Sequence, residues 1–212
     1  MRVEPWRWLL CPSVAATVHA LPRNAASINC ERTMTTSSQP ESDSVSQAFG
    51  SLEDSFIGLP REVLFRSVSS LNRMLAHTTA LRDLYKKSHW QTSGPTFYEL
   101  HLLFDKHYEE QVALMDSLAE RVQTLGGVAM ALASDIAGET RLARGPSGIE
   151  TARDQLTRLL KAHEFILTEA RPLGRKAADD GDDGTNDLMV SQIVRTNELQ
   201  SWFIRRHLKA AV

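Results

Sequence analysis

Apolar residues recur at helical spacing along most of the chain from residue 60 onward, and this periodicity is the strongest constraint on the fold. In the first such stretch the apolar positions are Leu64, Val68, Leu71, Leu75, Leu81, Leu84 and Tyr85. Spacings of three and four residues place these side chains on one face of an α-helix. The pattern therefore predicts an amphipathic helix over residues 60–89, ending before a Thr-Ser-Gly-Pro break.

A second helix is predicted over residues 95–125. Pro95 suits the first position of a helix, with Ser93 or Gly94 near the cap, and the Gly-Gly pair beginning at Gly126 marks the end. At 1.5 Å per residue this helix would be about 46 Å long. Its predicted core positions are Phe97, Leu100, Phe104, Tyr108, Met115, Leu118, Val122 and Leu125.

Two further long helices are predicted over residues 149–176 and 186–208, separated by the acidic turn 179–184. The looser stretch 128–148 has room for a short helix, and strand signals are absent from the sequence. Four long helices in one chain predict a four-helix bundle, and the linker before residue 149 is long enough to cross it. We therefore expect an all-α fold: a four-helix bundle with a short extra helix in the crossover between helices two and three.

Residues 1–59 differ from the rest, because they are rich in Ser, Thr and Gln and poor in apolar residues. Such composition predicts a disordered or extended N-terminal segment, with the bundle occupying residues 60–212. Two origins for the segment stay open. The first thirty residues resemble a targeting peptide, or the true start is Met34 and the preceding residues come from an upstream start codon.

Overall composition excludes several classes of protein. The only cysteines, Cys11 and Cys30, both precede the predicted bundle, which excludes a disulfide-built fold and favours a reducing cytoplasm. A net charge of −2 does not favour binding to nucleic acid or to an anionic membrane. No apolar run approaches the roughly 20 residues of a membrane-spanning helix, so we expect a soluble, cytoplasmic protein.

Side chains of metal-ligand type lie beside the apolar face of the second predicted helix. His101 and Asp105 are four residues apart, as are Asp116 and Glu120. At 100° per residue all four fall within a stripe about 100° wide. One such pair is an ordinary surface feature of helices. Two pairs in register, with His89 at the end of the preceding helix, favour a metal site.

The length of the helix decides how such a site could form. His101 and Glu120 are about 28 Å apart along the axis, whereas metal–ligand bonds are roughly 2.0–2.2 Å long. One chain therefore cannot bring both pairs to one metal. A two-fold axis near residues 110–111 would place His101 and Asp105 beside Asp116 and Glu120 of a second copy. Imidazoles and carboxylates without thiolates suit iron, manganese or zinc. The Glu-x-x-His motif of intrachain di-iron bundles is absent from the sequence.

These spacings resemble the signature of the Dps family, the mini-ferritins first described as DNA-binding proteins of starved cells. The matching residues are His89-Trp90, His101, Asp105, Asp116, Glu120-Arg121 and the Leu-Gly-Gly of residues 125–127. The broader similarity covers about residues 60–208.

The resemblance implies a ferritin-like bundle with a ferroxidase centre for two irons (Fe2+/Fe3+), shared by two chains. His89, His101 and Asp105 would come from one subunit, and Asp116 and Glu120 from its two-fold mate. It also implies a hollow homo-oligomer of twelve subunits, a dodecamer, that oxidises Fe(II), preferably with hydrogen peroxide. Ferric mineral would be stored inside, protecting the cell against oxidative damage.

Other residues carry separate interpretations. Trp90 is either a buried packing anchor or, as the resemblance implies, an interceptor of radical equivalents. Arg121 is expected to pair with a carboxylate. His107 lies about 200° around the helix from Asp105, so it is not expected to be a ligand, and His163 is expected at the edge of the core. The acidic run 179–184 is either a solvated loop or a cation-attracting surface near a pore.

DNA binding is where the chain departs from the family pattern. Residues 1–59 contain no lysine, four arginines and six acidic residues, whereas phosphate neutralisation needs clustered cations. The C-terminal cations Arg205, Arg206 and Lys209 also suit the end of a helix. We therefore expect weak or absent DNA binding. A non-enzymatic, nucleoid-compacting shell is the alternative function, and a bundle without metal is the third.

Overall fold

The structure is a computed structural model that describes residues 45–54 and 56–209. Predictions for residues 1–44, including Cys11, Cys30 and the start at Met34, lie outside this part. The elements in chain order are α1 (Arg61–Gln91), α2 (Phe97–Thr124), α3 (Ala133–Glu139), α4 (Ala152–Asp179), α5 (Asp183–Asp187), the π-helical η1 (Leu188–Val194) and α6 (Arg195–Leu208).

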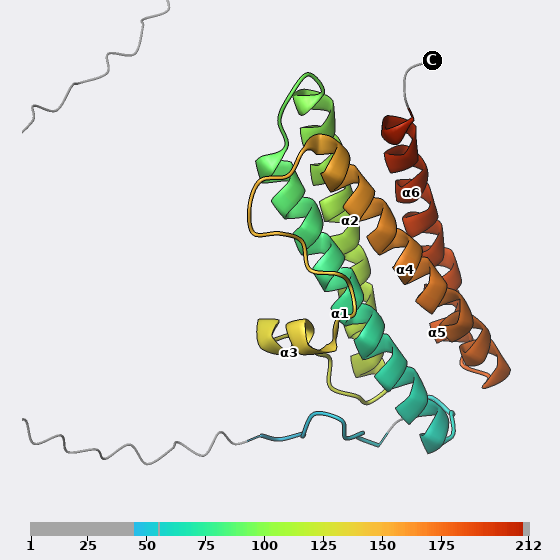
Figure 1. Cartoon of the computed structure of the whole chain (residues 1–212). Coiled ribbons are helices and arrows are strands. Elements are labelled where there is room, and N and C mark those ends of the chain that lie inside the picture. Colours follow the sequence, from blue (N-terminus) through green and yellow to red (C-terminus); the bar gives the residue numbers. More distant parts are fainter. Residues whose placement is uncertain (1–44, 55, 210–212) are drawn as a thin grey trace, which may run out of the picture. The chain divides into compact units, whose positions relative to one another are not determined.

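Four helical rods form the bundle: α1, α2, α4 and the C-terminal run of α5, η1 and α6 (Figure 1). Helix α3 lies in the connection between α2 and α4, and the described residues contain no strand. The predicted all-α four-helix bundle, with a short helix in its crossover, is confirmed. None of the described helices combines the length and apolar character needed to span a membrane.

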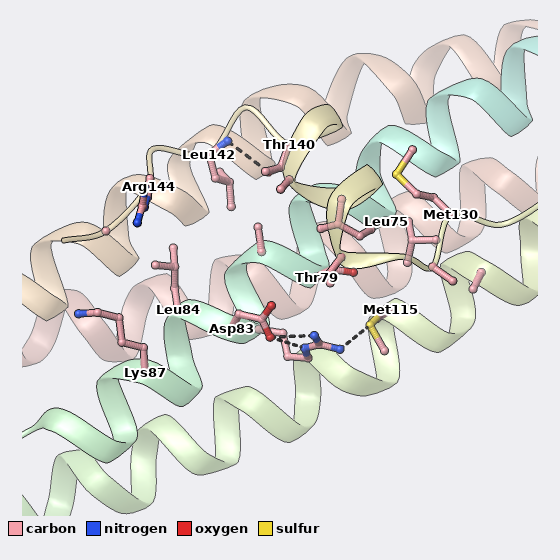
Figure 2. Close-up of a pocket in the computed structure, with 18 of the residues that line it drawn as sticks. Leu75, Thr79, Asp83, Leu84, Lys87, Met115, Met130, Thr140, Leu142 and Arg144 are labelled. Carbon is pink, nitrogen blue, oxygen red and sulfur yellow. Dashed lines mark hydrogen bonds and ion pairs between the residues drawn. The ribbon is translucent and has the colours of Figure 1, made fainter. Parts of the chain in front are cut away.

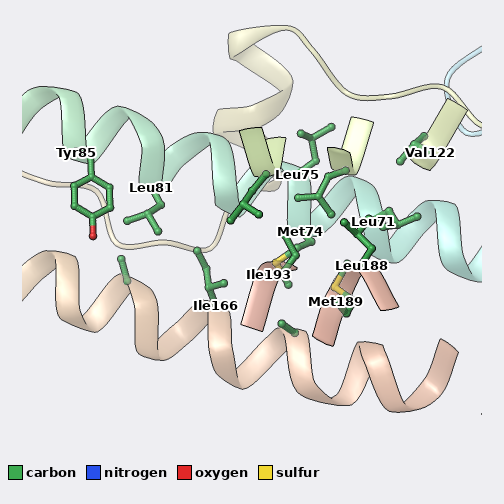
Figure 3. Packing of buried hydrophobic residues seen from close by; sticks show 14 of the residues in the cluster. Leu71, Met74, Leu75, Leu81, Tyr85, Val122, Ile166, Leu188, Met189 and Ile193 are labelled. Atoms are coloured by element: carbon green, nitrogen blue, oxygen red, sulfur yellow. The ribbon is translucent and has the colours of Figure 1, made fainter. Parts of the chain in front are cut away.

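The core forms where α1 packs against α2 and α4, and where α4 packs against η1 and α6. Figure 3 shows Leu71 and Met74 of α1 beside Ile193 of the C-terminal helical run, with Ile166 of α4 nearby. Burying a side chain of this kind contributes about 1.5–3 kcal/mol. Phe97 was predicted in the core but is 45% exposed. It opens α2 one turn before the first buried position, Leu100, beyond the reach of the core.

Helix α2 ends in a turn that explains the Gly-Gly pair. Gly126 has φ +83°, the N–H of Gly127 donates to the carbonyl of Val122 at 3.0 Å, and that of Gly126 donates to Gln123 at 2.9 Å. This pattern is a Schellman motif, which satisfies the last carbonyls of the helix. A Cβ at Gly127 would lie 2.5 Å from Cγ1 of Val68, so the second glycine lets the chain pass close to α1.

The C-terminal helical run begins earlier than predicted, within the acidic segment. Asp182 caps α5 by accepting from the N–H of Thr185 at 3.0 Å, and its side chain is 0% exposed. It also accepts from Ser67 at 2.6 Å and from Arg121 at 2.5 Å. The solvated-loop prediction is therefore wrong for Asp182, whereas the predicted carboxylate partner of Arg121 is confirmed. Burial acts to raise the pKa of Asp182, but these hydrogen bonds outweigh it and hold the pKa below its usual value.

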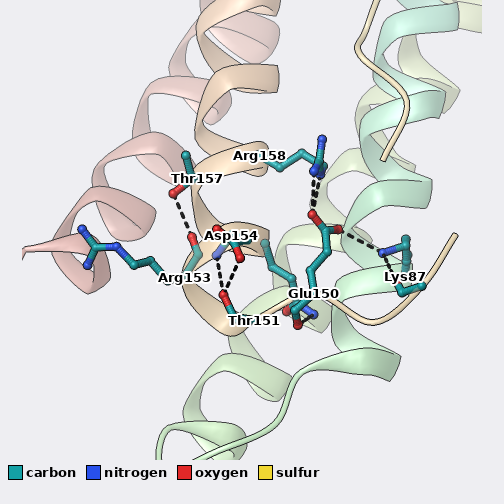
Figure 4. Close-up of polar contacts among 9 residues, drawn as sticks. Lys87, Glu150, Thr151, Arg153, Asp154, Thr157 and Arg158 are labelled. Carbon is teal, nitrogen blue, oxygen red and sulfur yellow. Dashed lines mark hydrogen bonds and ion pairs between the residues drawn. The ribbon is translucent and has the colours of Figure 1, made fainter. Parts of the chain in front are cut away.

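The end of the crossover is fixed to α1 through Glu150 (Figure 4). Its carboxylate accepts from Arg158 Nη2 at 2.6 Å and from Lys87 Nζ at 3.1 Å. Thr151 caps α4, with its hydroxyl accepting from the N–H of Asp154 at 3.2 Å. The Arg158 hydrogen bond is the main reason why the pKa of Glu150 lies below its usual value. This anchor holds the start of α4 against the last turns of α1.

The described part of the N-terminal segment contacts the end of α2. The carbonyl of Gly126 accepts from the N–H of Glu53 and from Nε2 of Gln47, both at 2.9 Å. Leu52 packs against the core cluster. Described residues that precede the first helix, such as Gln47, Leu52 and Glu53, thus belong to the same compact unit as the bundle.

Candidate metal centre

His89 and His101 face each other across the short connection between α1 and α2. Nδ1 of His89 lies 2.9 Å from the carbonyl oxygen of His101, and Nδ1 of His101 lies 3.0 Å from that of His89. The two rings are stacked, with centroids 3.7 Å apart and planes at 24°. The side chains of His89 and His101 thereby join the end of α1 to the start of α2.

These reciprocal hydrogen bonds fix the tautomer of both rings. A carbonyl oxygen can only accept, so each Nδ1 must carry the proton. In a neutral imidazole the lone pair then lies on Nε2. Metal-binding histidines commonly have their other ring nitrogen hydrogen-bonded in this way. His89 and His101 therefore each present an Nε2 atom that is ready to bind a metal ion.

Asp105 completes what we call the histidine cluster (His89, His101 and Asp105). Its Oδ1 lies 3.8 Å from Nδ1 of His89 and accepts from Nζ of Lys86 at 2.6 Å. The Lys86 hydrogen bond is the main reason why the pKa of Asp105 lies below its usual value. The carboxylate is thus ionised at neutral pH and 38% exposed, and Lys86 holds the position that a cation would take.

Asp116 and Glu120, which we call the acidic pair, lie further along α2 and away from the histidine cluster. They follow Asp105 by eleven and fifteen residues, or about 16 and 22 Å along the helix. Both are exposed, and neither carboxylate has a hydrogen-bond or ion-pair partner in the described part of the chain. No three His, Cys, Asp or Glu side chains among residues 45–54 and 56–209 come close enough to hold a metal ion. In one chain the histidine cluster residues are therefore neighbours without forming a complete ligand set, and the acidic pair lies apart from them.

Asp116 borders a largely apolar groove of about 760 Å³ between α1, α2 and the crossover with α3. Figure 2 shows Leu75, Leu84, Met115, Met130 and Leu142 lining it. Charges are paired at its edge, where Arg82 donates to Asp83 at 2.7 Å.

Large apolar side chains also lie exposed around the histidine cluster. Trp90 is 72% exposed, Tyr98 69% and Leu102 51%. The interpretation of Trp90 as a buried anchor is therefore wrong within a single chain, because the residue lies at the end of α1, beyond the bundle core. Exposed apolar groups gathered near one site are typical of a surface that another molecule covers.

Sequence reasoning missed Lys86 and underestimated the buried histidines. Lys86 precedes His89 by three residues, and this helical spacing was the available signal. His107, not expected to be a ligand, is 0% exposed and points into the core, as does His163, which was expected only at its edge. Both rings contact Tyr85, a partner that spacing along one helix cannot reveal.

Known proteins of the ferritin-like class match most of the chain. A family model of the ferritin-like domain matches residues 68–211. An uncharacterized protein of Kitasatospora aureofaciens is 49% identical over 136 residues, covering 64% of this chain and 91% of that protein. A nutrient stress-induced DNA-binding protein of Nostoc sp. is 32% identical over 152 residues, covering 72% of this chain and 83% of the relative.

Solved structures agree with this relationship. DpsC from Streptomyces coelicolor is 48% identical with a TM-score of 0.78, covering 79% of this chain and 98% of that one. A Dps protein from Vibrio cholerae O1 is 27% identical with a TM-score of 0.69, covering 77% of this chain and 100% of that one. It is described as a member of a broad superfamily of ferritin-like diiron-carboxylate proteins. The all-α bundle, the family match and these relatives agree: the chain belongs to the Dps family of ferritin-like proteins.

Proposed function

We propose that two copies of this chain form a two-fold dimer that oxidises Fe(II) at two shared sites. Each site would combine the histidine cluster of one subunit with the acidic pair of the other. Six such dimers would build the hollow dodecamer that stores the ferric product. Hydrogen peroxide is the proposed oxidant, since two Fe(II) ions supply the two electrons that reduce it to water without releasing hydroxyl radical.

The proposal rests chiefly on one observation, the reciprocal hydrogen bonds between His89 and His101. Because each Nδ1 carries a proton, each Nε2 keeps a lone pair with which it could bind a metal ion. Two imidazole nitrogens and three carboxylates suit iron, because iron accepts mixed nitrogen and oxygen ligands. The donor set therefore fits Fe(II) as a substrate and the harder Fe(III) as a product. The carboxylates offset the increase in positive charge on oxidation.

The unpaired acidic pair supports the role of a second chain. Asp116 and Glu120 are exposed carboxylates without partners in the described part of this chain, and Asp116 borders the apolar groove. An antiparallel second copy would cover that groove and bring its own histidine cluster to the acidic pair. An isologous contact of this kind forms two identical sites at once.

Complementation between two damaged chains tests the proposal. One chain carries His89→Asn and His101→Asn, the other Asp116→Asn and Glu120→Gln, and the two are co-expressed and purified together through different tags. Each variant alone lacks every complete site. In a mixed dimer, one site receives the intact histidine cluster from one chain and the intact acidic pair from the other. Random pairing should restore roughly a quarter of the wild-type rate of ferric absorbance.

The outcomes separate the alternatives. Full activity of either variant alone would show that the substituted residues do not serve the reaction. Absence of recovery in mixed oligomers of normal size would show that the sites are not shared between chains. Light scattering on every sample controls for assembly, since a stable monomer could not form these sites.

DNA binding is a second candidate function, favoured by the name of the Nostoc relative. The exposed cations Arg205, Arg206 and Lys209 at the end of α6 are the described residues best placed to meet phosphates. Few clustered cations give weak, salt-sensitive binding, so we expect little gel retardation at physiological salt. A tight shift of the purified oligomer would contradict this expectation.

A further inference from the structure

Three polar rings that belong to neither group of proposed ligands meet in the centre of the bundle. Tyr85 of α1, His107 of α2 and His163 of α4 are each 0% exposed, and we call them the buried polar cluster. The Tyr85 hydroxyl lies 2.5 Å from Nε2 of His163 and 3.1 Å from Nδ1 of His107. Polar groups are costly to bury unless they are paired, so the arrangement calls for a reason beyond packing.

The direction of the hydrogen bonds follows from Asn197. Its Nδ2 donates to the carbonyl of Ile193 at 2.7 Å, which leaves its Oδ1 facing Nδ1 of His163 at 2.7 Å. Because an amide oxygen can only accept, Nδ1 of His163 carries the proton. Burial lowers the pKa of His163 to about 4, so the ring is neutral at pH 7 and its Nε2 is an acceptor. The Tyr85 hydroxyl therefore donates to His163.

The phenol keeps its proton in the resting protein. Burial, with a further contribution from the charge of Glu110, holds the pKa of Tyr85 well above its usual value. Oxidation reverses this preference, because a phenol that has lost one electron becomes strongly acidic. In this interior the released proton has an acceptor at hydrogen-bond distance, Nε2 of His163.

The buried polar cluster lies next to the histidine cluster. Tyr85 precedes His89 by four residues, so it shares a face of α1 with that ligand and lies about 6 Å away along the axis. Its ring centroid is 6.2 Å from that of Phe104, the residue before Asp105. The phenol is thus adjacent, through two helices, to the place where iron would be oxidised.

We propose that Tyr85 supplies the second electron when peroxide meets a site holding a single Fe(II), and that its proton passes to Nε2 of His163. This inference rests on the proposed function. Hydrogen peroxide takes two electrons and two solvent protons to become two water molecules. Fe(II) gives one electron and becomes Fe(III), and Tyr85 gives the other and becomes a neutral tyrosyl radical. A later Fe(II) reduces the radical, and the proton returns from His163.

The role would protect the cell when iron is scarce. A single Fe(II) can give peroxide only one electron, which breaks the O–O bond and releases hydroxyl radical. A neighbouring phenol with a ready proton acceptor completes the two-electron reduction instead. At two Fe(II) per site the metal supplies both electrons, and Tyr85 is not needed.

Electron paramagnetic resonance of freeze-quenched oligomer tests the relay, with a single Fe(II) per site loaded anaerobically before peroxide is added. The chain has three tyrosines, so a variant with Tyr98→Phe and Tyr108→Phe leaves Tyr85 alone, without altering the core position. We expect this variant and the wild type to give the same radical. Ring-deuterated tyrosine should narrow the signal, which separates it from a radical on Trp90.

Two core variants complete the test. Tyr85→Phe should reduce the tyrosyl signal to background and increase spin-trapped hydroxyl radical at one Fe(II) per site, but not at two. His163→Gln retains a polar partner that cannot take up a proton, and should also lose the signal. If the core variants fail to assemble, the variant that keeps only Tyr85 still shows, by the presence or absence of the tyrosyl signal, whether Tyr85 is oxidised.

Ferric absorbance, recorded on the same samples, separates the two hypotheses. Iron oxidation in the wild type without a tyrosyl radical, or with a radical that survives Tyr85→Phe, overturns the relay and leaves the proposed function intact. No iron oxidation in the wild type overturns both. A radical present in the variant that keeps only Tyr85 and absent in His163→Gln is the result expected from the hydrogen-bond geometry.

Discussion

Nδ1 of His89 donates to the carbonyl of His101 at 2.9 Å, and Nδ1 of His101 returns the same bond to His89 at 3.0 Å. In the proposed site each histidine would therefore have two separate tasks. Nδ1 joins α1 to α2, and Nε2 would bind iron. Substitutions that copy only one of the two nitrogens can separate structure from metal binding.

Replacing His89 with Asn should separate these tasks, because the amide nitrogen of Asn occupies roughly the position of Nδ1. We expect His89→Asn to keep the bond to His101, so that the free energy of unfolding changes by less than about 1 kcal/mol. Fast Fe(II) oxidation should be lost, because the Nε2 ligand is gone. His89→Ala is the matched control and should lose both. Wild-type oxidation in His89→Asn would remove His89 from the proposed ligands.

Lys86 would compete with the proposed iron for Asp105, since its Nζ donates to Oδ1 at 2.6 Å. Removing the ammonium by Lys86→Met should strengthen anaerobic Fe(II) binding only a few-fold, because a partly exposed ion pair contributes about 0.2–1 kcal/mol. The pKa of Asp105 should rise, because the Lys86 hydrogen bond is the main cause of its low value. Titration calorimetry measures the affinity. Lys87→Met, which breaks the contact with Glu150 instead, should leave it unchanged.

The buried ion pair of Arg121 and Asp182 should be important for stability. Arg121→Met leaves a carboxylate that is 0% exposed without its charged partner, an effect that typically costs about 3–5 kcal/mol. We expect a clear fall in the thermal unfolding midpoint. The exposed pair of Arg171 and Glu198 provides the control, since Arg171→Met should cost less than about 1 kcal/mol. Equal effects of the two substitutions would contradict the importance assigned to burial.

Acid should destabilise the bundle through His163. Its pKa is about 4 in the folded chain, whereas a histidine exposed to water has a pKa of about 6.5. Between these two pH values the unfolded chain therefore binds a proton that the folded chain does not. The contribution is present above pH 6.5 and is lost as the pH falls towards 4, amounting to about 3 kcal/mol. The unfolding midpoint should therefore fall more steeply between pH 6.5 and 4 in the wild type than in His163→Gln. Identical slopes would show that His163 is not buried in its neutral form.

The sequence by itself determined the helices and the positions of the proposed ligands along them. Spacings of three and four residues depend only on helix geometry, so Leu71 and Leu75 could be assigned to the core in advance. The same geometry put His101 and Glu120 too far apart for one metal. It could not show that Phe97 would lie exposed at the start of α2, because exposure depends on where the neighbouring helices end.

Only the tertiary structure decided which side chains meet across helices. Tyr85 and His163 are 78 residues apart, and Ser67 and Asp182 are 115 residues apart. Such contacts depend on the rotation and axial offset of one packed helix against another, which a pattern along a single helix does not specify. The proton positions on His89, His101 and His163 follow from those contacts, because each is set by an oxygen of a distant residue.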